Sequence, residues 1–496
     1  MARAYASSCQ FFQKEQVYRS VGANIYVEVI LLCLSIKVNN YYKLVIANMK
    51  CTIPEISWHN RDPVLSVDIQ AVNNEEFYRL ASGGTDSHVL IWHLKILDTG
   101  ATLVEAVSDL TRHQRAVNVV RWSPSGQYLA SGDDDANIII WQQKADDLAI
   151  MLDGDNNDKE KWSVFKVLRG HKEDVYDICW SPDSLKLVSG SVDNTAIIWN
   201  LAKGNNENIL KDHKGFVQGV SWDPVGQYIA TLSSDRTCRV FNETGKQVRA
   251  RVSKGCLSVD DSHPLHGQVV RYYHDDTLKS FFRRLTFSPD GNLIITPAGY
   301  LEMGSNSANL YTTYIYTTSS LTQPAVVLPS PGQYTIAVRC CPILFELWPD
   351  GPEPAISLPY RMVIAVATRS SVILYDTQQT TPFAIISNIH YTRLTDVTWS
   401  NDASELGKEY VKEEEIVEEE PIVAELNETC EEIMDTSLNV SVEAELKEKK
   451  QSFLEQWASK SIKKTNKNEN KKYTAKNDED DDVIIIEPEI TQAIHI

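Results

Sequence analysis

Three stretches of the chain align without gaps: HQRAVNVVRWSPSGQYLASGDDDANIIIW (residues 113–141), HKEDVYDICWSPDSLKLVSGSVDNTAIIW (171–199) and HKGFVQGVSWDPVGQYIATLSSDRTCRVF (213–241). In each stretch the closing aromatic residue lies 28 positions after the opening histidine and 19 positions after an internal tryptophan. An aspartate stands six positions before each end: Asp135, Asp193 and Asp235. An earlier copy, RLASGGTDSHVLIW, ends at Trp92 and has Asp86 at the same offset. Such regular spacing is typical of a repeat architecture.

Within each repeat, apolar side chains recur at period two, as in VYDICW and AIIW, and turn-forming residues interrupt the pattern. This pattern predicts three or four short antiparallel strands per repeat. One sheet of that size cannot bury both of its faces, so several sheets must pack face to face around an axis. The fold class predicted for residues 49–402 is therefore an all-β propeller.

Weaker copies of the repeat extend the propeller toward the carboxyl end. Residues 283–318 and 334–376 have the pattern of a fifth and a sixth unit, and residues 389–403 open a seventh, so we predict seven blades. After Asp402 the chain passes directly into SELGKEYVKEEE, where further strands are expected. We therefore predict an incomplete last blade with an exposed edge, completed in part by Cys51–Trp58. The abrupt change favours a missing stretch of coding sequence near residue 403.

The residues at the repeated offsets resemble those of the WD-repeat family, whose histidine, serine or threonine, aspartate and tryptophan form a hydrogen-bonded stack. The best match in this sequence is His171, Ser189, Asp193 and Trp199. Histidine, aspartate and serine also form the triad of hydrolases. Because this set recurs once per repeat together with a tryptophan, a structural role is favoured.

The composition narrows the classes of function. Lys and Arg total 48 against 67 for Asp and Glu, giving a net charge of −19, which argues against binding the DNA backbone as the main task and favours basic partners. Nine scattered cysteines favour a reducing, intracellular compartment. The sequence displays no spacing of metal ligands, no phosphate loop and no nucleophile elbow, so we expect no metal, no cofactor and no catalytic site.

Residues 1–48 are expected to be an extension outside the folded domain. Their apolar run, Ile25–Ile36, is twelve residues long and contains Glu28. A membrane-spanning helix needs about 20 residues, and no small-residue cleavage site follows the run. We therefore expect no membrane association.

Several stretches are more specific than generic repeats, among them WHNRDPVLSVDIQ, SFFRRLTFSPDG with TPAG, and VILYDTQQTTPFAIISNIHY. Together they resemble the family of WD-repeat, middle-sized subunits of chromatin assembly factor one, over nearly all of residues 49–402. The resemblance implies a nuclear, non-enzymatic histone chaperone subunit. Such a subunit works with the large and small subunits of that factor to deposit histones three and four on replicated DNA, without sequence-specific DNA binding. The alternatives are a HIRA-type, replication-independent chaperone and a ubiquitin ligase substrate receptor, for which we find no adaptor-binding box.

Acidic residues on the blade tops are the candidate contacts for basic histones or other subunits. They are Asp133, Asp134, Asp135, Glu173 and Asp174, together with the neighbouring Tyr176. Ordinary turn chemistry is the alternative for each aspartate. A second candidate is an aromatic and basic anchor for another subunit, formed by Phe281, Phe282, Arg283 and Arg284. Partial burial is the alternative for the two phenylalanines.

Residues 403–496 are predicted to be a disordered, charged tail. Residues 405–448 contain 16 acidic and 3 basic side chains, too polar to form a core, so they either shield histones or serve as a solubilising linker. In the following basic block, the nearest equivalents of the family's docking element for the anti-silencing histone chaperone are Lys449, Lys450, Phe453, Leu454 and Trp457, although the usual paired arginines are absent. Five acidic residues then precede a run that resembles a SUMO-interacting motif, with a chance apolar patch as the alternative: Val483, Ile484, Ile485 and Ile486.

Overall fold

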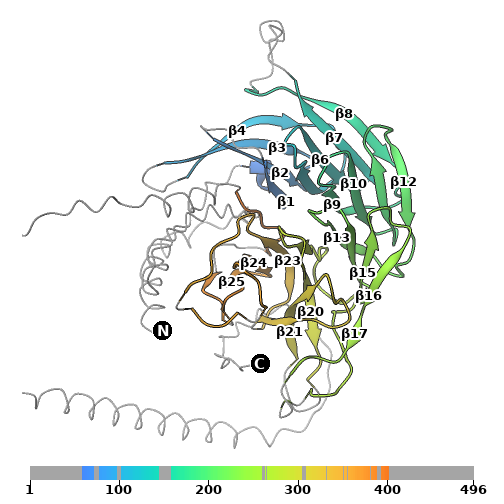
Figure 1. Ribbon diagram of the computed structural model, residues 1–496. Coiled ribbons are helices and arrows are strands. Elements are labelled where there is room, and N and C mark those ends of the chain that lie inside the picture. The colour runs from blue at the N-terminus through green and yellow to red at the C-terminus, as the bar shows by residue number, and fades with distance from the viewer. Residues whose placement is uncertain are drawn as a thin grey trace, which may run out of the picture. The chain divides into compact units, whose positions relative to one another are not determined.

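The computed structural model describes residues 58–400, apart from residues 72–76, 98–101, 145–157, 260–262, 264, 304–308, 331, 350, 355, 380 and 388–392. These residues form six four-stranded antiparallel sheets and one small two-stranded sheet (Figure 1). The helical element within this part of the chain is a single 3-10 turn, η3 (Trp58–Arg61). The predicted all-β propeller class is confirmed.

Each four-stranded sheet is a blade whose strands follow one another along the chain. Blade 1 consists of β1 (Val64–Ile69), β2 (Tyr78–Gly84), β3 (Val89–Ile96) and β4 (Thr102–Leu110). Blade 2 consists of β5 (Val117–Trp122), β6 (Tyr128–Asp133), β7 (Asn137–Gln143) and β8 (Trp162–Arg169). Blade 3 consists of β9 (Val175–Trp180), β10 (Lys186–Ser191), β11 (Ala196–Asn200) and β12 (Asn205–Leu210).

Blades 4 to 6 continue in the same order. Blade 4 consists of β13 (Val217–Trp222), β14 (Tyr228–Ser233), β15 (Thr237–Asn242) and β16 (Val248–Val252). The two-stranded sheet that follows it consists of β17 (Lys254–Gly255) and β18 (Val270–Arg271). Blade 5 consists of β19 (Thr286–Phe287), β20 (Leu293–Leu301), β21 (Leu310–Thr317) and β22 (Val326–Ser330). Blade 6 consists of β23 (Thr335–Cys340), β24 (Val363–Thr368), β25 (Ser371–Asp376) and β26 (Ala384–Ser387).

The prediction of seven blades is wrong for the described residues, which contain six. The unit expected to open a seventh blade contributes one extended segment, residues 393–400, with no strand assigned. This segment bridges the first and last blades, since the hydroxyl of Thr395 donates to the carbonyl of Val64 (2.9 Å) and the indole of Trp399 donates to the carbonyl of Arg339 (3.1 Å). The physical reason is that a blade needs further strand-forming sequence, and after Asp402 the chain becomes highly acidic. Most of the predicted clasp, residues 51–57, lies outside the described residues.

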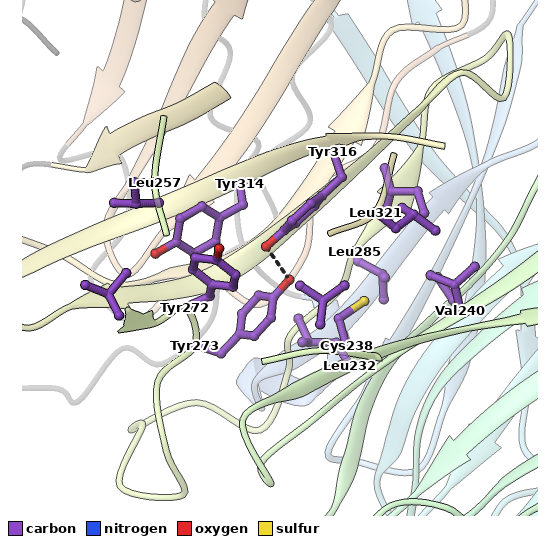
Figure 2. Packing of buried hydrophobic residues seen from close by; sticks show 14 of the residues in the cluster. Leu232, Cys238, Val240, Leu257, Tyr272, Tyr273, Leu285, Tyr314, Tyr316 and Leu321 are labelled. Atoms are coloured by element: carbon purple, nitrogen blue, oxygen red, sulfur yellow. Dashed lines mark hydrogen bonds between the residues drawn. The ribbon is translucent and has the colours of Figure 1, made fainter. Parts of the chain in front are cut away.

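The apolar core is divided into layers between neighbouring blades. Ile91 of blade 1 packs with Trp122 and Leu129 of blade 2, and the remaining interfaces are built in the same way. The layer between blades 4 and 5 is rich in tyrosine. Figure 2 shows the rings of Tyr272, Tyr273, Tyr314 and Tyr316 gathered there beside Cys238. The hydroxyl of Tyr273 donates to that of Tyr316 (3.2 Å), which satisfies a polar group that would otherwise be costly to bury.

A buried charge cluster joins the inner strands to the bridging segment, and its centre is Asp396, whose side chain is 1% exposed. Atom Oδ2 of Asp396 accepts a hydrogen bond from Nη1 of Arg121 (2.8 Å) and lies 3.0 Å from Nη1 of Arg284, while Oδ1 lies 3.6 Å from Nη2 of Arg339. Burial alone would raise the pKa of Asp396, but these three guanidinium charges outweigh burial and hold the pKa well below its usual range. The cluster therefore ties blades 2, 5 and 6 to the bridging segment.

The backbone of β13 at Gly219 lies close against the segment that leads into blade 5. The backbone N–H of Arg283 donates to the carbonyl of Gln218 (3.0 Å), and a methyl group at Gly219 would collide with the carbonyl of Arg283. We expect Gly219→Ala to lower the free energy of unfolding by about 1–3 kcal/mol, because backbone atoms cannot move aside as a flexible side chain can. Urea unfolding followed by tryptophan fluorescence measures this loss. An unchanged urea midpoint of unfolding would contradict the close contact between Gly219 and the carbonyl of Arg283.

Candidate interaction surface

The repeated histidines lie inside the blades and connect their strands. In blade 3, Nε2 of His171 lies 2.7 Å from Oγ of Ser189 and Nδ1 lies 2.9 Å from Asp193, while the indole of Trp199 donates to the same Ser189 oxygen (2.8 Å). The arrangement recurs in the other early blades with these histidine, hydroxyl and carboxylate partners: His59, Ser82 and Asp86 in blade 1; His113, Ser131 and Asp133 in blade 2; and His213, Thr231 and Asp235 in blade 4.

These hydrogen bonds occupy the hydroxyl, imidazole and carboxylate groups that a hydrolase triad would use. The hydroxyl of Ser189 is fully buried and has both His171 and Trp199 as partners. Burial would raise the pKa of Asp193, but its hydrogen bonds with His171 and Thr195 hold the pKa far below the usual range. The carboxylate therefore stays charged and holds His171 in place. His171 in turn connects the segment that precedes β9 to strand β10.

Two of the structural residues were missed or misplaced by sequence spacing. His59 begins the first repeat, but it lies 33 residues before Trp92 instead of 28, which hid it. In blade 2 the partner of His113 is Asp133, at 2.7 Å, and not Asp135 at the repeated offset. Asp135 is exposed and forms a surface ion pair with Arg115 at 3.7 Å. Asp133 is 1% exposed, so the prediction that it contacts a partner is wrong.

The other predicted acidic contacts do gather on one surface. Asp134 lies between β6 and β7, Glu173 and Asp174 precede β9, and Tyr176 belongs to β9. The amide of Asn118 links these elements, since its Nδ2 donates to Oδ1 of Asp134 (2.6 Å) and to the carbonyl of Val175 (3.1 Å). The ring of Phe281 lies 6.0 Å from that of Tyr176, centroid to centroid. We call Asp134, Glu173, Asp174, Tyr176 and Phe281 the acidic-aromatic patch.

The acidic-aromatic patch carries negative charge that the described residues do not neutralise. None of its three carboxylates forms an ion pair within the part of the chain that the structure describes. Burial and the neighbouring charges of Asp134 and Glu173 raise the pKa of Asp174. Burial, followed by the charges of Asp174 and Asp134, raises the pKa of Tyr176 to about 12. Because these groups repel one another, a cation bound among them would be favoured.

The predicted aromatic and basic anchor is wrong for three of its four residues. Phe281 is 64% exposed, but Phe282 is 2% exposed and both arginines are fully buried. Arg283 donates to Oε1 of Gln218 (2.7 Å) and to the carbonyl of His274 (2.6 Å). Arg284 lies in the buried charge cluster around Asp396. Their many buried acceptors offset the cost of taking two guanidinium groups out of water.

The buried charge cluster around Asp396 was not predicted. Its members are Asp68, Arg121, Asp177, Arg284, Arg339 and Asp396. A signal was present, because Asp177 and Asp396 each lie three residues before the tryptophan that ends a strand-like pattern, in VYDICW and TDVTW. A charged residue at such a position needs a buried partner.

The predicted tail contacts, Lys449, Lys450, Phe453, Leu454, Trp457 and Val483–Ile486, lie outside the described residues and stay predictions. So do residues 1–48. In the described ranges, no group of three or more histidine, cysteine, aspartate or glutamate side chains is arranged to hold a metal ion. No helix found there has the length and apolar character needed to cross a bilayer.

Comparison with known proteins identifies close relatives of the propeller. The model of the CAF1B/HIR1 beta-propeller domain family matches residues 49–407. A chromatin assembly factor 1 subunit of Mus musculus, of the CAF1B type, is 48% identical over 370 residues, covering 72% of this chain and 64% of that protein. The chromatin assembly factor 1 subunit FAS2 homolog of Oryza sativa subsp. japonica is 42% identical over 364 residues, covering 71% and 69%. Protein HIR1 of Kluyveromyces lactis is 28% identical over 345 residues, covering 65% and 38%. The chain thus spans slightly less than two thirds of the mouse relative.

Proposed function

Because the chain belongs to the CAF1B/HIR1 β-propeller family, we propose that it is a non-enzymatic histone chaperone subunit of a chromatin assembly factor. The match of the family model across residues 49–407 is the observation that carries this proposal. The higher identity to chromatin assembly factor subunits than to HIR1 favours replication-coupled assembly over the replication-independent alternative. The resulting partners are the large and small subunits of the factor and histones three and four, and the place of action is the nucleus.

The acidic-aromatic patch supplies a physical means of holding a histone. Histones are strongly basic, and three carboxylates without cationic partners attract lysine and arginine from a distance. Tyr176 and Phe281 offer apolar surface beside that charge, and aromatic residues are frequent at the energetic centres of protein interfaces. The protein would then compete with DNA for the histones without binding DNA itself.

We expect charge reversal of the patch to weaken histone binding. The variant is Asp134→Lys, Glu173→Lys and Asp174→Lys in the full chain, and binding to the histone three and four tetramer is measured by surface plasmon resonance. We expect the association rate at low salt to fall by about 10-fold or more, because electrostatic steering is lost. The matched control changes exposed carboxylates elsewhere by the same total charge: Glu243→Lys, Glu346→Lys and Glu353→Lys. If the association rate fell equally in both variants, the effect would come from net charge, and the acidic-aromatic patch would not be the histone-binding surface.

The family assignment is tested separately by purification of the tagged full chain from nuclear extract of S-phase cells. We expect the large subunit of the factor and a second histone-binding WD-repeat protein to be recovered with it. Recovery with a replication-independent chaperone complex, or with a ubiquitin ligase adaptor, would refute the proposal. Docking of Lys449–Trp457 on the anti-silencing histone chaperone and binding of Val483–Ile486 to SUMO are further proposals for the tail.

A further inference from the structure

The outer strand of blade 4 is strongly basic, although the protein as a whole is acidic. Residues 246–254 read KQVRARVSK and contain four cations and no acid. Arg271 of β18 lies opposite Lys254 of β17 and extends the same stripe. We call Lys246, Arg249, Arg251, Lys254 and Arg271 the basic edge. All five side chains are exposed, and none forms an ion pair with a carboxylate in the described residues.

The backbone of β16 is available on one side. The sheet order is β13-β14-β15-β16, so β16 pairs with β15 and ends the sheet, at the outer rim of the ring in Figure 1. Val248 of this strand is 47% exposed, and the guanidinium of Arg249 lies 4.7 Å from the centre of the Tyr228 ring. A free strand edge with exposed backbone groups is a template for the addition of another strand.

The outer strands of the other blades lack this combination. Strand β4 carries Glu105 and Asp109, and β22 contains Pro329, which has no N–H to donate. Strand β8 has two cations, Lys166 and Arg169, against the four of residues 246–254, and Lys166 is bonded to the carbonyls of Leu201 and Ala202 at 2.5 and 2.8 Å. Arg249 of the basic edge makes a longer contact, 3.4 Å, with the carbonyl of Thr318. Strand β12 has Glu207, paired with Lys186, and β26 is only four residues long. The basic edge is therefore suited to an acidic, strand-forming peptide.

We propose that the basic edge binds residues 478–487 of this chain's own tail, DEDDDVIIIE, as an added strand. This segment places five consecutive acids directly before four β-branched residues. The β-branched residues favour an extended strand whose backbone pairs with the free edge of β16. The acids then lie among the cations of the basic edge and neutralise them.

The length of the chain permits this contact. About 80 residues separate Ser400 from Val483, and a flexible chain of that length spans about 50 Å on average. A domain of the propeller's size has a radius of gyration of about 20 Å. Tethering also raises the effective concentration of the segment to the millimolar range, so weak pairing suffices. Docking covers an edge that would otherwise promote aggregation and withdraws the Val483–Ile486 run from other partners.

Photo-crosslinking of the full chain tests the proposal. The photoreactive residue p-benzoylphenylalanine replaces Ile485, and cross-linked peptides of the monomer fraction are identified by mass spectrometry. We expect cross-links to residues 246–254. Arg249→Glu with Arg251→Glu should lower their yield at least tenfold, whereas the control Lys211→Glu with Lys214→Glu, two exposed cations of the loop that precedes β13, should leave it unchanged. Raising the salt concentration should lower the yield in the parent chain.

Three outcomes would overturn the proposal. The first is cross-linking to other strands, or only between molecules. The second is an unchanged yield when Arg249 and Arg251 are reversed. The third is binding of duplex DNA that depends on these arginines while no cross-link forms, which would make phosphate the ligand. Circular dichroism of the doubly reversed variant establishes that it is folded, and a reversal at Lys246 and Lys254 gives an independent test should it not be.

Discussion

We expect Asp396→Ala to lower the free energy of unfolding by about 3–5 kcal/mol, the cost of leaving a buried ionic group without its partner. Asp396 is surrounded by Arg121, Arg284 and Arg339, and it also accepts a hydrogen bond from the hydroxyl of Ser66 (2.8 Å). Removal of the carboxylate leaves Arg121 and Arg284 buried with fewer acceptors. Because the bridging segment joins blades 1 and 6, its loosening should weaken the whole propeller.

The pH dependence distinguishes this charge effect from a simple loss of packing. The pKa of Asp396 is lower in the folded protein than in the unfolded chain, where aspartate has a pKa of about 3.9. Its contribution to stability is therefore fully present above that pH and is lost as the pH falls through the folded-state pKa. The difference in unfolding free energy between the parent and Asp396→Asn should shrink as the pH falls below about 4.

Urea unfolding at a series of pH values measures this difference. Asp212→Asn is the matched control, because Asp212 is an exposed aspartate in the loop between β12 and β13 and forms no ion pair among the described residues. The control should leave the stability nearly unchanged at every pH. If the loss for Asp396→Asn were the same at low and neutral pH, the carboxylate charge would not be what holds the segment.

The spacing of the repeated histidine, aspartate and aromatic residues along the chain was sufficient to predict the blades that contain regular repeats. The positions of His171, Ser189, Asp193 and Trp199 depend on contacts within one sheet, and sequence offsets describe such contacts directly. Blade 2 departs from the offset because three consecutive aspartates offer a choice, and the geometry of the turn brings Asp133 to His113.

Contacts that form around the ring could not be predicted from spacing within a repeat. Arg284 and Asp396 are 112 residues apart, and they meet only because the inner strands converge. Without that information Arg283 and Arg284 resemble an exposed basic pair, whereas the structure buries both. The acidic-aromatic patch could be predicted in part. Its acids were identified from their turns, but the approach of Phe281 to Tyr176 depends on segments from different blades.

We expect Trp199→Ala to lower the free energy of unfolding by about 3–5 kcal/mol, as for other large aromatic residues removed from a core. Trp199 is 1% exposed and packs among Ile197, Leu201 and neighbouring residues of blades 2 and 3. It also holds Ser189 through its indole N–H, so its loss leaves both a cavity and an incompletely bonded hydroxyl. Thermal and urea unfolding of the full chain measure the effect.

The matched variant Trp199→Phe should cost far less, because blade 4 already accommodates Phe241 at the equivalent position. There Thr231 keeps its contact with Nε2 of His213 at 2.7 Å, so the histidine remains fixed without an indole. We expect a loss well below that of the alanine variant, made up of about 1 kcal/mol for the hydrogen bond and a smaller cavity. If Trp199→Phe lowered the free energy of unfolding as much as Trp199→Ala does, the indole N–H would be essential to blade 3. Blade 4, which has no indole at this position, would then need another stabilising group. The guanidinium of Arg239, which lies against His213 and donates to Asp235 at 3.1 Å, would have to be that group.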